Sequence, residues 1–166
     1  MNKSKIPAIL FLILTVLCCL VIWSFSFDNA ESSGAESDRV GEITSEAVEK
    51  VSGAKVTFEP FVIRKTAHFV EFAVLGVLLY MTFHYFGIRK IKTNYAIGVS
   101  VSFAVAAIDE FLQLFSEGRS AQMGDVLLDV IGSMFAFSIC VCIYFLSKKR
   151  RKKLECAFEY YLSAYV

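Results

Sequence analysis

The sequence predicts an all-α polytopic membrane protein: a four-helix transmembrane bundle with both termini cytoplasmic. Hydrophobic residues make up 56% of the chain, so too few polar residues remain to cover a soluble domain of this size. Four apolar runs approach the roughly 20 helical residues needed to cross a bilayer core of about 30 Å. Lysine and arginine gather on one side of the path that these runs define, which predicts a fixed orientation in the membrane.

Each predicted span is bounded by polar sequence. The first run is apolar throughout, whereas each of the other three is interrupted by a few ionisable side chains. We expect the spans at residues 6–27, 67–86, 95–115 and 126–146. They would form one transmembrane domain, residues 1–146, followed by a basic cytoplasmic tail, residues 147–166.

The first run has an alternative interpretation as a cleaved signal peptide. Lys3 and Lys5 give it a basic start, and residues 24–26 form a small-x-small sequence of the kind cleaved by signal peptidase. Against this, the run is longer than the apolar core of an ordinary signal peptide. Trp23 also sits where an interfacial aromatic anchor would lie. We therefore expect a retained helix.

Orientation follows from the distribution of positive charge. The basic clusters precede the first span, separate the second from the third, and follow the fourth. They therefore lie on one side of a four-span path, and positive loops stay in the cytoplasm. Residues 28–63 and 116–124 are then predicted to lie outside.

The long outer connection, residues 28–63, has a pattern of its own. Val40, Ile43, Ala47 and Val51 recur at helical spacing, which indicates an amphipathic helix lying on the outer membrane surface. Residues 32–34 before it, Ser-Ser-Gly, are expected to form a flexible link.

Six ionisable side chains interrupt the second, third and fourth spans. A charge at the centre of a membrane helix costs roughly 2.5–3.5 kcal/mol on insertion scales, so such residues usually mark a site. At a rise of about 1.5 Å per residue, all six lie near the predicted outer end of their helix. We therefore expect one polar pocket that opens outward. The six are His68, Glu71, Asp109, Glu110, Asp125 and Asp129.

Spacing within each helix agrees with a shared interior. Arg64, His68 and Glu71 fall on one stripe, and Gln113 lies within one turn of both Asp109 and Glu110. Asp125 and Asp129 continue into small residues at 132, 133 and 136, a face that lets helices approach closely. The turn at residues 116–120 places Arg119 at the membrane surface, near Arg64 and Lys65.

Three ordered motifs resemble those of the VanZ-like family. Residues 64–71 read RKTAHFVE, similar to the family pattern RKxxHxxE, and residues 109–113 read DEFLQ, similar to DExxQ. Gly118 and Arg119 followed by DVLLD at residues 125–129 resemble the third motif. One position departs from it, because Asp129 stands where the family usually has Asn. This departure puts in doubt any role there for a neutral amide donor.

The resemblance says more about where the pocket lies in the membrane than about which reaction, if any, the protein performs. The family is named after a member that gives low-level resistance to the glycopeptide teicoplanin. That resistance suits an outer-leaflet pocket that binds a lipid-linked wall precursor or another lipophilic head group. The expected partners are membrane lipids or such a precursor, with an oligomer possible. No nucleic acid is expected, because the basic run at residues 148–153 suits an anionic-lipid anchor. The candidate ligand-binding residues are Arg64, Lys65, Glu71, Gln113, Arg119, Asp125 and Asp129.

Two other functions stay open from the sequence. A membrane-embedded enzyme could use His68 and Glu71 as base and Asp109 or Glu110 as acid. No organic cofactor is predicted, although His68, Glu71 and an Asp could instead bind a divalent metal. A small proton-coupled transporter is the third alternative. Structural roles compete as well, since Arg64 and Lys65 could snorkel to the surface and Asp125 could cap its helix.

Overall fold

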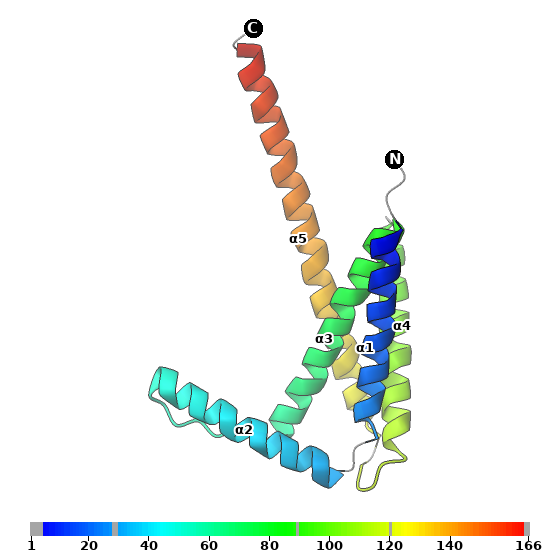
Figure 1. The fold of residues 1–166 in the computed structure, drawn as a ribbon, viewed down its shortest axis with the longest axis vertical. Coiled ribbons are helices and arrows are strands. Elements are labelled where there is room, and N and C mark those ends of the chain that lie inside the picture. The colour runs from blue at the N-terminus through cyan, green and yellow to red at the C-terminus, as the bar shows by residue number, and fades with distance from the viewer. Residues whose placement is uncertain (1–4, 28–29, 89, 120, 165–166) are drawn as a thin grey trace.

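The computed structural model describes residues 5–27, 30–88, 90–119 and 121–164, and these residues form five α-helices and no strand (Figure 1). The helices are α1 (Ile6–Phe25), α2 (Ala30–Ser52), α3 (Pro60–Phe86), α4 (Ile91–Gln113) and α5 (Met123–Ala164). Four of them are long and apolar enough to cross a bilayer: α1, α3, α4 and the part of α5 up to Cys156. The all-helical class and the four predicted spans are confirmed.

Two of the helices, α3 and α5, are longer than the predicted spans by more than a full turn. α3 begins at Pro60, whose fixed φ and missing N–H suit the first turn of a helix. It ends at Gly87, which takes the left-handed conformation (φ 78°) that glycine adopts without strain. α5 runs without interruption through the basic tail to Ala164. The predicted tail is therefore largely a continuation of the last span, since no Pro or Gly follows the span to end the helix.

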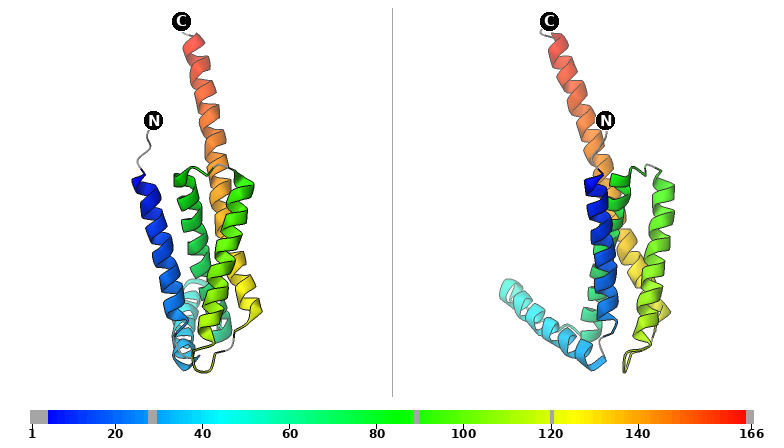
Figure 2. Two further views of the ribbon diagram at one scale, coloured as in Figure 1. Left: turned by 90° about the vertical axis from the view of Figure 1, so that its right-hand side faces the viewer. Right: turned by 45° about the vertical axis from the view of Figure 1, so that its right-hand side comes forward.

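The connection between α1 and α3 is mostly helical. The expected amphipathic helix exists as α2, but residues 32–34 lie inside it, so the flexible link is wrong. Good helix formers surround these residues, and Glu31 in the first turn interacts well with the helix dipole. Val40, Ile43 and Val51 are exposed. α2 lies across the end of the bundle farthest from both chain termini and extends beyond it (Figures 1 and 2).

α3 lies at the centre of the bundle and makes its closest contact with α5. A methyl group built on Gly76 would lie 2.0 Å from the carbonyl oxygen of Ser133. One built on Gly132 would lie 2.6 Å from the carbonyl oxygen of Phe69. The predicted small-residue face of α5 is thus confirmed as a close-packing surface. Its partner glycine on α3 was not predicted.

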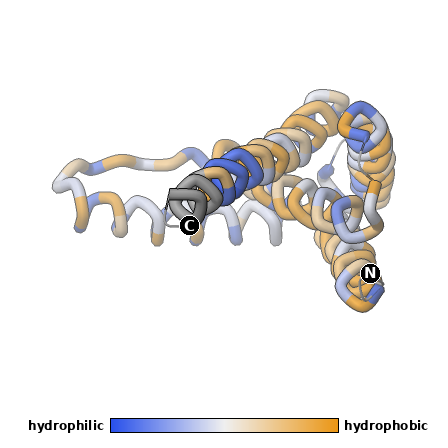
Figure 3. The backbone as a smooth tube through the Cα atoms, turned by 90° about the horizontal axis from the view of Figure 1, so that it is seen from above, coloured by the Kyte–Doolittle hydropathy of each residue, from blue (hydrophilic) through white to orange (hydrophobic). Residues whose placement is uncertain are grey.

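The core between the spans combines aromatic packing with a few hydrogen bonds. The ring of Phe137 is fully buried and meets Tyr80, Phe83 and Tyr95 at centroid distances of 5.1 to 6.1 Å. Ser102 and Ser133 share a buried hydrogen bond of 2.7 Å between α4 and α5. Many large apolar side chains of the spans are exposed, and hydrophobic residues predominate along the spans in Figure 3, as expected of helices that face lipid.

Candidate functional site

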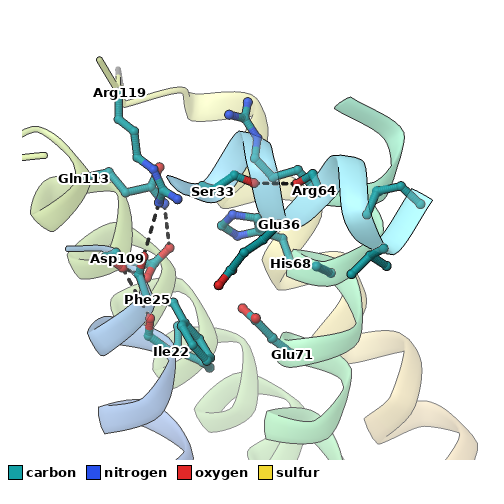
Figure 4. Close-up of a pocket in the computed structure, with 15 residues that line it drawn as sticks. Ile22, Phe25, Ser33, Glu36, Arg64, His68, Glu71, Asp109, Gln113 and Arg119 are labelled. Atoms are coloured by element: carbon teal, nitrogen blue, oxygen red, sulfur yellow. Dashed lines mark hydrogen bonds between the residues drawn. The ribbon is translucent and has the colours of Figure 1, made fainter. Parts of the chain in front are cut away.

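A cavity of about 200 Å³ opens at the end of the bundle that lies away from both termini. Side chains from α1, α2, α3 and α4 line it, and Arg119 from the α4–α5 connection completes the wall (Figure 4). α2 contributes Ser33, Glu36, Ser37 and Val40, so this helix forms the roof. The polar stripes predicted on α3 and α4 therefore do face a common space.

Asp109 anchors the α4 wall of the cavity. Its carboxylate is 1% exposed and accepts hydrogen bonds from Ser26 Oγ and from Gln113 Nε2, the latter at 2.9 Å. Ser116 Oγ donates to the carbonyl oxygen of Ser26 at 2.6 Å. These bonds tie the end of α1 and the start of the α4–α5 connection to the carboxylate. Ser26 had not been predicted as a site residue, because a serine at the end of an apolar run carries no distinctive signal.

His68, Asp109 and Asp129 come together at the edge of the cavity, which the first two of them line. One potential ligand atom from each lies within 4.8 Å of the others. His68 Nδ1 is 3.6 Å from Asp129 Oδ1, and Asp129 is completely buried. Three different helices supply these groups, so the predicted convergence of polar residues from separate spans is confirmed for this triad.

Three further predicted residues face the cavity: Glu71, Arg64 and Arg119 (Figure 4). Arg119 donates from Nη1 to the carbonyl oxygen of Phe25 at 3.4 Å, and its Nε atom is buried without a hydrogen-bond partner. Among the described residues, neither arginine forms an ion pair with a carboxylate. Much of the hydrogen-bonding capacity of both guanidinium groups is therefore available to a ligand.

Lys65 and Asp125 do not line the cavity. They pair with each other instead, with side chains only 18% and 10% exposed, and join the start of α3 to the start of α5. The ammonium group of Lys65 also lies 5.2 Å from the centre of the Phe61 ring. Their role in the structure is to hold two spans together.

Glu110 also points elsewhere. It is 4% exposed, and its Oε2 atom accepts a hydrogen bond of 2.6 Å from the backbone N–H of Gln122. This hydrogen bond holds the α4–α5 connection against the end of α4. Neighbouring positions on a helix point in directions about 100° apart, which is why Asp109 reaches the cavity and Glu110 does not.

These features define a class: a small multi-pass membrane protein whose spans enclose a charged pocket at one end. The model of the VanZ/LLP1 family matches residues 10–146, most of the chain, and the protein belongs to this family. The match includes most of α1 and every residue that lines the cavity. No curated protein and no solved structure matches the chain.

Proposed function

We propose that this protein contributes to resistance against teicoplanin-type glycopeptides, or against related stress on the cell envelope, by binding an anionic head group in the pocket. The observation that carries the proposal is the pair of arginines, Arg64 and Arg119, which face one cavity and form no ion pair with a carboxylate among the described residues. Guanidinium groups bind phosphate and carboxylate through paired, charge-assisted hydrogen bonds.

The size of the cavity restricts the ligand. Pockets that enclose drug-sized molecules measure roughly 300–1,000 Å³, whereas this one measures about 200 Å³. It suits a phosphate-bearing or carboxylate-bearing head group better than a whole glycopeptide. A lipid-linked wall precursor or an anionic phospholipid would offer such a group while its chains remain in the bilayer.

The proposal includes an orientation. The pocket lies at the end of the bundle away from both termini (Figure 2), and the described basic residues at 90, 92 and 148–153 lie toward the other end. Positive charge favours the cytoplasmic side. In a plasma membrane the pocket would then open at the outer leaflet, where wall precursors and lipophilic glycopeptides meet.

Replacing Arg119 by alanine should abolish protection against teicoplanin. The substitution removes a charged donor from the cavity, and among the described residues the Arg119 side chain donates one hydrogen bond, the long one to Phe25. Susceptibility would be measured in a teicoplanin-sensitive host that expresses the variant, alongside the abundance of the protein in the membrane.

Arg39→Ala provides the matched control, because Arg39 is an exposed arginine of α2 that does not line the cavity. It should leave protection unchanged. A stably inserted Arg119→Ala variant that protects as well as the unmodified protein would contradict the proposed function.

A further inference from the structure

We propose that His68, Asp109 and Asp129 form a binding site for one divalent transition-metal cation at the edge of the cavity. The three residues come from α3, α4 and α5, and their candidate ligand atoms lie within 4.8 Å of one another. This site is distinct from the arginine-lined part of the cavity, and it does not depend on which head group binds there.

The strongest evidence is that the buried carboxylate of Asp129 lacks hydrogen-bond partners. Its side chain is 0% exposed, and neither carboxylate oxygen has a hydrogen-bond partner among the described residues. A buried carboxylate without partners costs several kcal/mol, by the general scale for burying ions. Native proteins therefore rarely leave such a group unsatisfied unless it serves a bound ion or a reaction.

His68 does not supply the missing hydrogen bond to Asp129. Its Nδ1 atom lies 3.6 Å from Asp129 Oδ1, which is too long for a hydrogen bond, and Nδ1 is itself buried without a partner. A protonated His68 would supply charge at that distance but no bond to either oxygen. A cation between the imidazole and the carboxylates would satisfy all of these atoms at once.

The donor set indicates which cations fit. One imidazole nitrogen and two carboxylate oxygens suit Zn²⁺ or Mn²⁺, whereas Ca²⁺ and Mg²⁺ favour oxygen ligands alone. Two carboxylates also balance the charge of a divalent ion in a buried place. Ligand atoms bound to Zn²⁺ at about 2.0–2.2 Å lie roughly 3–3.5 Å apart, so the triad needs only a small contraction to bind one.

The surroundings of Asp109 have the form of a metal site. Its carboxylate is oriented by Ser26 and Gln113, and metal-binding carboxylates are commonly held by such outer hydrogen bonds. Each oxygen keeps a second lone pair for a metal. Glu71 faces the cavity next to His68 (Figure 4). Its carboxylate is outside the close group of ligand atoms, so Glu71 would have to shift to bind the same ion.

The test is metal binding by the full-length protein, purified in detergent without a histidine tag and stripped of metal. Titration with Mn²⁺ and with Zn²⁺ should show about one tight site per chain. Asp129→Asn preserves the shape of the side chain but removes its charge, and should weaken binding by more than about 100-fold, since even outer-shell changes cost 10- to 100-fold. Asp38→Asn, on the exposed surface of α2, should bind as the unmodified protein does.

A spectroscopic readout covers the case in which Asp129→Asn fails to fold. Electron spin-echo modulation of Mn²⁺ bound to the unmodified protein should show coupling to an imidazole nitrogen. The signal should survive His84→Gln, which changes the one other histidine in the chain. Three results would overturn the proposal: no stoichiometric binding of either ion, unchanged binding by a folded Asp129→Asn variant, or bound Mn²⁺ without nitrogen coupling. None of them bears on the Arg119 experiment, so the two proposals can fail separately.

Discussion

Replacing Gly76 by alanine should strongly destabilise the bundle. The added methyl group would lie 2.0 Å from the carbonyl oxygen of Ser133, and that oxygen belongs to the backbone of α5. It cannot rotate aside as a side chain could, so the two helices must separate. Overpacking of a core usually costs about 1–3 kcal/mol, and we expect a loss of free energy of unfolding at or above the upper end of that range. The measurement is unfolding in detergent, followed by circular dichroism.

Gly124→Ala is the control for this substitution. Gly124 also lies in α5, but a methyl group there would meet nothing within 4 Å. The Gly124→Ala variant should therefore be as stable as the unmodified protein or slightly more stable. If the Gly76→Ala variant unfolds at the same midpoint as the unmodified protein, α3 and α5 do not approach as closely as described. The same helix pair carries His68 and Asp129, so a Gly76→Ala variant that still inserts should also lose metal binding.

Replacing Lys65 by methionine should destabilise the protein by about 3 kcal/mol, because it leaves Asp125 largely buried without its partner. Removing one member of a buried ion pair typically costs about 3–5 kcal/mol, and the partial exposure of both side chains (18% and 10%) places the expected effect at the lower end. Methionine keeps much of the packing against Phe61. The double variant Lys65→Met/Asp125→Leu should recover most of the loss, since no charge remains unpaired.

A second lysine provides the comparison. Lys50 pairs with Glu46 at 3.8 Å on α2, where the side chains are 78% and 72% exposed, and exposed pairs contribute at most about 1 kcal/mol. Lys50→Met should therefore leave the unfolding midpoint almost unchanged. A double variant as unstable as Lys65→Met alone would argue against the pair as the cause. The lysine would then act through other contacts, among them the ligand contact that its position in the sequence suggested.

The fold could be predicted from the sequence to the extent that hydropathy governs it. Apolar runs of bilayer length specify four spans whatever their neighbours, and helical rise places the charges of each span at a common depth. Asp109 and His68 were therefore expected to lie near each other before any tertiary contact was known. α2 was only partly predicted, because polar helices carry a weak periodic signal and Ser-Ser-Gly resembles a linker.

The assignment of partners within the site could not be predicted in the same way. Lys65 and Arg64 are adjacent in sequence and equally basic, yet they point to different neighbours, one to Asp125 and the other into the cavity. That outcome depends on the rotation of α3 about its axis, which the contact at Gly76 helps to set. Ser26 was missed for a related reason, since its role exists only once α1 and α4 lie side by side.

The uninterrupted course of α5 has a mechanical consequence. One helix carries Asp129 inside the bundle and the basic residues 148–153 beyond the other spans. Sharp kinks in helices arise mostly at Pro, at Gly/Ser pairs or at π-bulges, and residues 133–164 contain neither Pro nor Gly. A displacement of the protruding arm would therefore act on the position of Asp129, because both belong to one continuous helix.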